Sequence, residues 1–206
     1  MSERVVLVDV GLGNLRSVAK AVETAGRSAN IELTRSDDPE LVRRADRLIV
    51  PGQGEFGNIA ERFSHGIGEA IRERLQSGAP YLGICLGLQI LFEESEEAPG
   101  TRGLGWFRGR VQRLTGAPGV KIPHMGWNQV ESASAASPLI PAGEWYYFVH
   151  SYHAVPSEPD VSRWVSSYGP NTVTAAVARE QVFATQFHPE KSQAAGLALL
   201  TRFLEG

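Results

Sequence analysis

The chain has 206 residues, which suits one compact domain over residues 1–206 and is enough to bury a substantial core. Its 20 Lys and Arg against 23 Asp and Glu give a formal net charge of -3, so the composition offers no reason to expect nucleic acid binding. No apolar run approaches the ~18 residues of a membrane span, and a single cysteine excludes an internal disulfide framework and fits a reducing compartment. We therefore expect a soluble, cytoplasmic protein.

The first half alternates apolar runs with helical spacing. Residues 5–8 form an apolar run typical of a buried parallel strand, and apolar residues then recur at helical intervals from Leu15 to Ala25. Asn14 can cap this helix and Gly26 can end it. The same alternation predicts strands at 31–33, 48–50 and 80–84 and helices at 38–44, 59–75 and 86–93. This order predicts an α/β fold: an open, mostly parallel central sheet with helices on both faces.

The second half consists mainly of short strand-like runs separated by Gly, Pro and Ser. They predict antiparallel additions to the same sheet rather than a second domain, at 106–114, 146–149, 163–168, 173–178 and 182–187. The small, Pro- and Ser-bearing stretch 133–141 is expected to be a surface loop. A last helix is predicted at 193–204, with Leu197, Leu200 and Leu204 on one stripe.

The segment 83–87 reads Gly-Ile-Cys-Leu-Gly and falls where a strand is predicted to turn into a helix. The pattern indicates a nucleophile elbow, in which flanking glycines permit a tight turn and the central side chain projects from it. A helix N-terminus favours a thiolate at Cys85, and the same turn aims the amide of Leu86 at a developing oxyanion. The alternative is a buried structural cysteine.

A nucleophile of this kind needs a base, and His188 follows the predicted strand 182–187. In extended backbone Glu190 lies on the same side as His188, so its carboxylate can fix one ring nitrogen and leave the other for the thiol. Pro189 disfavours a helical conformation at His188. In isolation, the His188-Pro189-Glu190 motif could equally be a strand-end histidine beside a solvated glutamate. Another histidine, His65, is expected to be exposed and inert.

Two glycine-bearing turns require a choice between loop and site. Pro51-Gly52-Gln53-Gly54 follows the third predicted strand, so its amides can supply a second oxyanion donor near Cys85; the alternative is a plain loop. Gly11-Leu12-Gly13 superficially suggests a dinucleotide fingerprint, but Arg16 stands where the third glycine is needed. We found no Walker A sequence and no metal-ligand spacing, so we expect no cofactor and no metal.

The motifs G-I-C-L-G-L-Q around Cys85 and F-H-P-E at 187–190 resemble the class I (triad) glutamine amidotransferases, and the resemblance covers essentially the whole chain. Further segments resemble one branch of that family, the glutaminase subunits of imidazole glycerol phosphate synthase. They are D-V-G-L-G-N-L-R-S-V at 9–18, P-G-Q-G-E-F at 51–56, I-P-H-M-G-W-N at 122–128, Y-F-V-H-S-Y at 147–152 and Q-F-H-P-E-K-S at 186–192.

The resemblance implies a reaction and site residues. Cys85 would attack the side-chain amide of L-glutamine, with His188 and Glu190 completing a Cys-His-Glu triad. By motif match, Gln89 and Glu97 would hold the α-amino end of glutamine, and the backbone around Ser151 and Tyr152 its carboxylate. The amides near Gly52, Gln53 and Gly54 would form the oxyanion strand.

The resemblance also implies a partner. Ammonia would pass to a (β/α)8-barrel cyclase subunit in a heterodimer, which makes imidazole glycerol phosphate and an aminoimidazole ribotide in histidine biosynthesis. Family members are almost silent alone, which a wrongly turned Gly52-Gln53 peptide would explain at a cost of ~3 kcal/mol per missing oxyanion donor. Gln53 stands where valine is frequent in the family.

In the family, the segments carrying Asn14, Arg16, Trp127 and Tyr147 lie at the cyclase interface, and an exposed Trp or Arg is a typical interface anchor. The alternative is that Trp127 and Tyr147 are core aromatics and that Asn14 only caps a helix.

Three other functions compete with this interpretation. A class I glutaminase serving anthranilate, aminodeoxychorismate or pyridoxal phosphate synthesis should lack the segments 9–18 and 122–128. A stand-alone cysteine hydrolase or peptidase would act without a partner. A binding module without catalysis gives no reason to keep Cys85, His188 and Glu190 together.

Overall fold

A computed structural model of the protein describes residues 2–11, 14–133 and 139–206. Its first half contains four parallel strands, β1 (Glu3–Val8), β2 (Ile31–Ser36), β3 (Arg47–Gly52) and β4 (Tyr81–Cys85), in the spatial order β2-β1-β3-β4. Every residue of β3 and β4 is buried, as their continuous apolar sequences predict for central parallel strands. The predicted parallel core of the sheet is therefore confirmed.

The sheet continues into the second half through β12 (Val182–Thr185), β11 (Asn171–Arg179), β10 (Ser162–Tyr168), β7 (His124–Ser132) and β8 (Glu144–His150). The expectation that 182–187 is simply an antiparallel addition was wrong, because β12 is antiparallel to β11 but parallel to β4. A tight turn at Glu180, with φ 55°, reverses the chain after β11 and gives β12 this direction. The carboxyl ends of β12 and β4 consequently meet at one edge of the sheet.

A second, three-stranded sheet contains β5 (Glu94–Ser95), β6 (Gly109–Arg113) and β9 (Tyr152–Pro156). The segment 106–114, expected in the main sheet, lies here instead because β6 pairs with β5 and β9. Strands β7 and β9 were not predicted. In β7 the glycine at 126, with φ 130°, and the exposed Met125 and Trp127 obscure the pattern of a half-buried strand.

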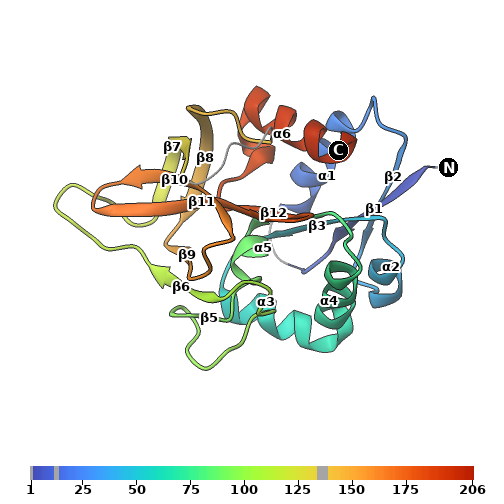
Figure 1. The fold of residues 1–206 in the computed structure, drawn as a ribbon, viewed down its shortest axis with the longest axis horizontal. Helices are drawn as coiled ribbons and strands as arrows, with labels where there is room; N and C mark the ends of the chain where they lie inside the picture. Colours follow the sequence, from blue (N-terminus) through green and yellow to red (C-terminus); the bar gives the residue numbers. More distant parts are fainter. Residues whose placement is uncertain (1, 12–13, 134–138) are drawn as a thin grey trace.

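Helices cover both faces of the main sheet, as predicted. Figure 1 shows α1 (Leu15–Ala25) and α6 (Gln193–Glu205) on one face, and α2 (Pro39–Arg43), α3 (Phe56–Arg62) and α4 (Gly68–Gln76) on the other. The predicted helix 59–75 is not continuous. A π-helical segment, η1 (Phe63–Ile67), separates α3 from α4, and Gly66 within it has φ 91°, which only glycine adopts without strain.

Local signals set the ends of α1. The side chain of Asn14 accepts a hydrogen bond from the Ser17 amide at 3.2 Å, and the amide of Gly26 donates to the Val22 carbonyl at 2.8 Å. The predicted boundaries of this helix are confirmed. Part of the expected loop 133–141, residues 134–138, lies outside the described residues, as do Leu12 and Gly13.

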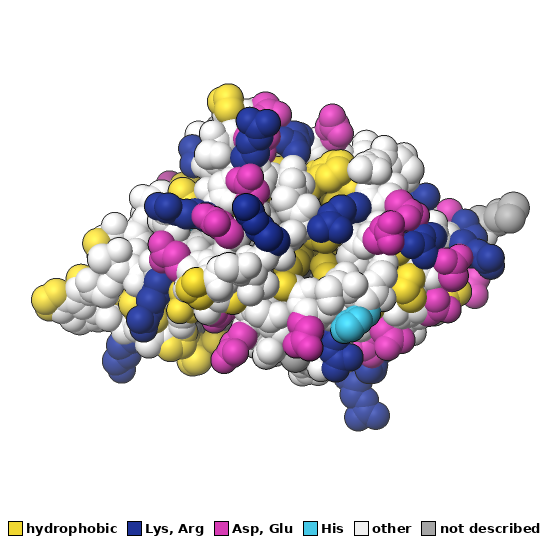
Figure 2. All heavy atoms as spheres, turned by 90° about the horizontal axis from the view of Figure 1, so that it is seen from below, with side chains coloured by type: hydrophobic (Ala, Val, Ile, Leu, Met, Phe, Trp, Pro, Cys, Tyr) yellow, Lys and Arg dark blue, Asp and Glu magenta, His cyan; other side chains and the backbone are white. Residues whose placement is uncertain are grey.

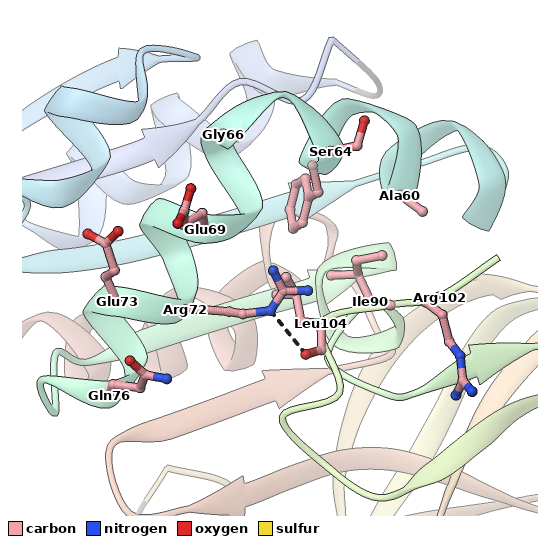
Figure 3. A pocket seen from close by; sticks show the side chains of 12 residues that line it. Ala60, Ser64, Gly66, Glu69, Arg72, Glu73, Gln76, Ile90, Arg102 and Leu104 are labelled. Carbon is pink, nitrogen blue, oxygen red and sulfur yellow. Dashed lines mark hydrogen bonds between the residues drawn. The ribbon is translucent and has the colours of Figure 1, made fainter.

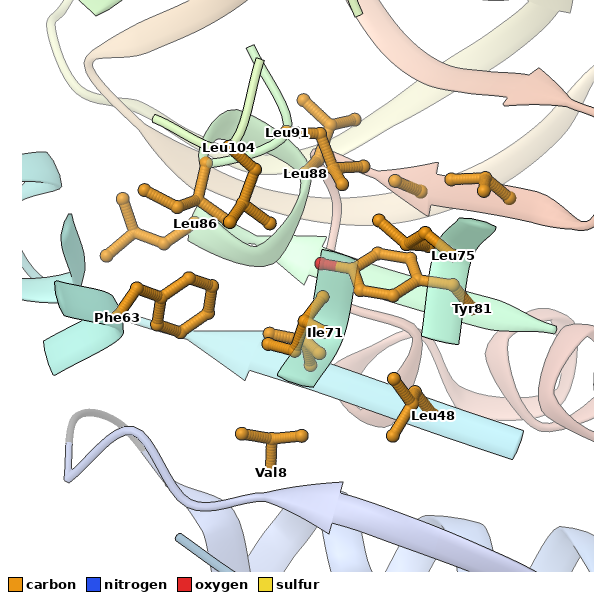
Figure 4. Close-up of a cluster of buried hydrophobic side chains, with 14 of the residues drawn as sticks. Val8, Leu48, Phe63, Ile71, Leu75, Tyr81, Leu86, Leu88, Leu91 and Leu104 are labelled. Atoms are coloured by element: carbon orange, nitrogen blue, oxygen red, sulfur yellow. The ribbon is translucent and has the colours of Figure 1, made fainter. Parts of the chain in front are cut away.

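A large apolar cluster lies under the end of β4. Figure 4 shows the Tyr81 ring among leucine and isoleucine side chains that include Leu48, Ile71 and Leu75. The Tyr81 hydroxyl donates to the Gly87 carbonyl at 2.7 Å, and burial raises the pKa of this phenol. This hydrogen bond connects the first residue of β4 to the segment that follows the strand.

The surface mixes charges of both signs. Figure 2 shows basic and acidic side chains interspersed over the face seen there. None of the helices in the described parts of the chain is long and apolar enough to cross a membrane.

Candidate active site

Cys85 ends β4 on a strained turn. Its backbone has φ 56° and ψ -104°, a conformation that costs a residue other than glycine about 1–3 kcal/mol and that clusters at functional sites. The next residue begins α5 (Leu86–Gln89). This is the strand-turn-helix context of a nucleophile elbow, and the cysteine itself carries the strain.

The two flanking glycines serve close packing rather than unusual backbone angles. A Cβ atom at Gly83 would overlap the Gly87 carbonyl, and one at Gly87 would overlap the carbonyl oxygen of Val50. Gly52 is in register with Cys85, and a Cβ there would lie 2.7 Å from Cβ of Leu86. The flanking glycines therefore permit the tight turn, as expected, and they do so by letting α5 lie directly against β3 and β4.

The helix after Cys85 is much shorter than the predicted 86–93. Only Leu86–Gln89 is α-helical, and the next amides bond as separate turns, for example Phe92 to the Gln89 carbonyl at 3.1 Å. A helix dipole grows with the number of aligned peptides, so one turn stabilises a thiolate less than the expected two.

His188 and Glu190 form a buried pair. Nδ1 of His188 lies 2.8 Å from a carboxylate oxygen of Glu190, and each side chain is 1% exposed. His188 is extended, with φ -102° and ψ 98°, as the following proline predicts. Glu190, however, lies in a 3-10 turn, Pro189–Lys191, so this turn and not continued extended backbone brings the two side chains together.

The charge state of His188 depends on its neighbours. Burial opposes its protonation, but the Cys85 thiolate and the Glu190 carboxylate together raise its pKa to about 9. Nε2 of His188 is buried and makes no hydrogen bond of standard geometry among the described residues. At neutral pH the site therefore favours an imidazolium that Glu190 holds through Nδ1 and that the Cys85 thiolate stabilises.

A cavity of about 280 Å³ opens beside Cys85. It brings together most of the predicted oxyanion and substrate residues: Gln53, Gly54, Cys85, Leu86, Gln89, Glu97, Ser151 and Tyr152. Gly52 faces instead a narrow cavity of about 10 Å³, which it shares with Asn14, His188 and Glu190. Glu97 accepts a hydrogen bond from the Phe56 amide at 2.8 Å, and burial raises its pKa.

A polar residue that sequence reasoning missed lies against the sulfur. Gln186 is fully buried, and its Nε2 donates to Sγ of Cys85 at 3.6 Å. Its Oε1 accepts from Nε2 of Gln89 at 3.0 Å. The available signal was a glutamine two residues before His188, at the end of an apolar strand.

Two further histidines, His124 and His150, also lie near the cavity without a predicted role. Their rings are joined through Nδ1 of His124 and Nε2 of His150 at 2.9 Å, and Nδ1 of His150 lies 2.9 Å from the Tyr152 carbonyl oxygen. Burial lowers the pKa of His124 to about 4 and, with the neighbouring His124, that of His150 to about 3. Both rings are therefore neutral near pH 7.

The predicted interface residues lie at or near the surface. Trp127 is 43% exposed, which rules out the alternative that it is a core aromatic, and its ring meets Tyr147 edge-on at 6.2 Å. Tyr147 is half-buried, whereas Asn14 and Arg16 are exposed. Met125 and Trp145, exposed on β7 and β8, were not predicted. His65 is exposed, as expected.

A larger cavity of about 570 Å³ lies away from Cys85, between α3, α4 and the segment 102–104. Figure 3 shows charged side chains around it, including Glu73, Arg102 and Arg72, whose Nε donates to the Leu104 carbonyl at 3.3 Å. It is larger than the cavity at Cys85, but neither a cysteine nor a histidine is among the described residues that line it. The cavity at Cys85 is therefore the better candidate for catalysis.

Comparison with known proteins shows the family of the chain. Residues 6–205 match the family model described as glutamine amidotransferase class-I. The chain is 49% identical to the imidazole glycerol phosphate synthase subunit HisH of Methylococcus capsulatus, over 97% of this chain and 95% of that protein. It is 47% identical to the HisH subunit of a Synechococcus strain, over 98% and 93%.

Solved structures share the fold. A crystal structure of a glutamine amidotransferase superposes with a TM-score of 0.75 at 24% identity, covering 97% of each chain. The structure of PurLQS from Thermotoga maritima gives a TM-score of 0.70 at 19% identity, covering 100% of this chain and 98% of that one. The family model and the high identity to the HisH subunits show where the chain belongs. It is a class-I glutamine amidotransferase and, within that family, one of the HisH subunits of imidazole glycerol phosphate synthase.

Proposed function

We propose that Cys85, His188 and Glu190 form the catalytic triad of a glutaminase, which hydrolyses L-glutamine to glutamate and ammonia. One observation carries the proposal: the parallel strands β4 and β12 end at the same edge of the sheet, where β4 presents Cys85 on a strained turn and the chain after β12 presents a buried His-Glu pair. A lone buried cysteine would need neither the strain nor the pair.

In the first half-reaction the Cys85 thiolate attacks the side-chain carbonyl carbon of glutamine and forms a tetrahedral oxyanion. The C–N bond then breaks, and the His188 imidazolium donates its Nε2 proton to the departing nitrogen, which leaves as ammonia. Because the pKa of His188 is raised to about 9, its ring carries that proton at neutral pH. The product on the enzyme is a γ-glutamyl thioester of Cys85.

In the second half-reaction the thioester is hydrolysed. In the thioester, Cys85 no longer carries a negative charge, so one of the two anions that raise the pKa of His188 is removed. The pKa of His188 therefore falls, and the neutral ring is more easily formed. His188 then takes a proton from water, which attacks the carbonyl carbon, and the C–S bond breaks to release glutamate and the thiolate. Glu190 holds Nδ1 throughout, so Nε2 performs both proton transfers.

The cavity supports glutamine as the substrate. Glu97 offers a carboxylate to the α-ammonium group of glutamine, and both amide hydrogens of Gln89 are engaged within the protein, which leaves its oxygen free to accept from the same end. The backbone at Ser151 and Tyr152 would receive the α-carboxylate. The amides of Leu86 and of the strand end at Gly52, Gln53 and Gly54 would stabilise the oxyanion.

We further propose that the chain works as one glutaminase domain in a cytoplasmic heterodimer with a (β/α)8-barrel cyclase subunit that receives the ammonia. The names of the relatives as subunits of imidazole glycerol phosphate synthase support a partner of this kind. Four residues would form the contact surface: the exposed Trp127 with Tyr147 beside it, the exposed Arg16, and Asn14, which shares a narrow cavity with His188 and Glu190. Docking would set the Gly52-Gln53 peptide for catalysis.

The test is glutamate release from glutamine, measured with and without the cyclase subunit and its nucleotide ligand. We expect strong stimulation by the partner and loss of activity in Cys85→Ala. Full activity in Cys85→Ala would reject the nucleophile, and absence of stimulation would reject the proposed partnership. Activity of the isolated chain on other amides or peptides would favour a stand-alone hydrolase instead.

A further inference from the structure

We propose that Gln186 is a positioning residue that holds the sulfur of Cys85 through a side-chain N–H donor and favours its thiolate form. Nε2 of Gln186 lies 3.6 Å from Sγ, and Gln186 and Cys85 are both buried. The inference rests on the proposed function in taking Cys85 as the nucleophile. It adds a second polar neighbour of the sulfur, besides His188.

The orientation of the Gln186 amide follows from a fixed acceptor. The carbonyl oxygen of Tyr152 can only accept, so the group of Gln89 that lies 3.0 Å from it is the amide nitrogen. The second hydrogen of that nitrogen points to Gln186, whose oxygen lies 3.0 Å away. Gln186 must therefore turn its own nitrogen toward the sulfur, and a flipped amide would set two donors against each other.

The hydrogen-bonded network continues away from the site, and the direction of donation reverses at the Tyr152 carbonyl, which accepts from both sides. The Tyr152 carbonyl also accepts from Nδ1 of His150, so Nε2 of that ring is an acceptor and receives the hydrogen on Nδ1 of His124. Nε2 of His124 in turn faces the amide nitrogen of Asn128 at 3.2 Å. All six groups, which we call the amide chain, have one consistent set of hydrogens: Asn128, His124, His150, the Tyr152 carbonyl, Gln89 and Gln186.

The position of Gln186 follows from the strand register. Thr185 pairs with Ile84 in the parallel ladder of β12 and β4, so the next residue of each strand is Gln186 and Cys85. The Gln186 amide nitrogen also donates to the Ala175 carbonyl at 2.8 Å, which holds its backbone to β11. The side chain therefore starts from a fixed backbone beside the sulfur and has its oxygen held by Gln89.

A donor at this place has a specific chemical effect. An N–H group aimed at sulfur stabilises the thiolate more than the neutral thiol, because a hydrogen bond to a charged acceptor is the stronger one. The other supports of the thiolate are α5, which is only one turn long, and the positive charge of the His188 imidazolium. The alternative is that Gln186 is a buried amide whose hydrogen bonds serve only the stability of the fold.

The test uses the fact that the chain has one cysteine, so alkylation by iodoacetamide reports on Cys85 alone. The second-order rate is measured against pH on the full chain, without partner or glutamine, in the unaltered protein and in Gln186→Met, which keeps the size and removes the donor. We expect the pH of half-maximal rate to rise by about one unit in Gln186→Met, and the rate at pH 7 to fall about tenfold. Gln186→Glu keeps the acceptor for Gln89 but places an anion at the sulfur, so we expect a larger upward shift.

Thr185→Val is the matched control. It removes a buried hydroxyl on the neighbouring residue, whose hydrogen bond goes to the Phe187 carbonyl and not to the sulfur. Thermal unfolding of each variant is measured alongside, and the control profile should match that of the unaltered protein. An unchanged profile in folded Gln186→Met and Gln186→Glu would overturn the proposal.

A measurement on the unaltered protein decides the matter even where variants unfold. The side-chain amide resonances of Gln186 should shift with the same pH midpoint as alkylation, and absence of that shift would overturn the proposal. Neither readout requires glutaminase activity, so failure of the proposed function and failure of this inference are separable. An active glutaminase with an unresponsive Gln186 rejects only the positioning role.

Discussion

The sulfur of Cys85 lies between two regions that differ in their hydrogen bonding. On one side, which we call the triad side, are His188 and Glu190, where Nε2 of His188 is buried without a standard hydrogen bond among the described residues. On the other side is the amide chain, in which hydrogen bonds join each group to the next from Asn128 to the sulfur.

The difference teaches how the two regions divide the work. The amide chain is neutral and geometrically committed, so it can hold the sulfur and the substrate residue Gln89 in place but cannot move a proton during turnover. On the triad side, the charge of the His188 ring changes with that of the thiolate, which is what a group that alternates between acid and base requires.

The largest expected effect comes from breaking the triad side. His188→Asn removes both proton transfers, so we expect kcat for glutamate release in the cyclase complex to fall ~10³-fold or more. His65→Asn is the matched control, because His65 is exposed and remote in η1. Retention of a tenth or more of the activity in His188→Asn would assign proton transfer to another group.

Both regions depend on the packing of the turn that carries Cys85. A methyl group at Gly87 would overlap the Val50 carbonyl, so we expect Gly87→Ala to lower the free energy of unfolding by ~3 kcal/mol or to prevent folding. In Gly57→Ala the added Cβ would meet only Ala98, at 3.5 Å, so this control should fold as before. Chemical denaturation compares the two, and equal stability would mean that the turn can move away from β3.

Acid is expected to destabilise the amide chain at His150, in its middle. The pKa of His150 is about 3 in the folded protein, below the ~6.5 of the unfolded chain, so the unfolded state binds more protons as pH falls below ~6.5. Because the ring stays neutral in the folded protein, we expect the free energy of unfolding to be ~2 kcal/mol lower at pH 5 than at pH 7.

Denaturation curves at several pH values measure this cost, and His150→Asn, which keeps a donor near the place of Nδ1, should flatten the dependence between pH 5 and 7. An unchanged pH dependence in that variant would show that another group carries it.

The smallest effect concerns the strand that joins the amide chain to the surface. On β7, His124 is buried in the chain, whereas Trp127 is 43% exposed. We expect Trp127→Ala to weaken cyclase binding about tenfold without unfolding the isolated chain. Leu41→Ala is the control, because Leu41 is 40% exposed on α2, away from β7. Equal affinity for both variants, measured by titration calorimetry, would remove Trp127 from the interface.

The two halves of the chain differ in how far their structure could be predicted. The parallel strands and α1 follow from apolar runs, helical spacing and end signals such as Asn14 and Gly26, which are local. The direction of β12, the separate sheet of β6 and the strand β7 depend on pairing with distant segments, which local patterns do not report.

The site shows the same division. Cys85 and His188 lie in recognisable local motifs, and the His188–Glu190 contact was predicted, although from an extended backbone that is in fact a 3-10 turn. Gln186 was missed because a single glutamine at a strand end carries no local sign of its partner. Only the register of β12 with β4 places it beside the sulfur.

The central claim is that Cys85 is the nucleophile that attacks the side chain of glutamine. The most direct test treats the cyclase complex with a glutamine analogue that carries an electrophilic diazoketone in place of the amide, and locates the label by peptide mass spectrometry. We predict one label per chain, on Cys85, with inactivation that follows labelling and is slowed by added glutamine. A label on another residue, or full glutaminase activity after Cys85 is labelled, would contradict the account.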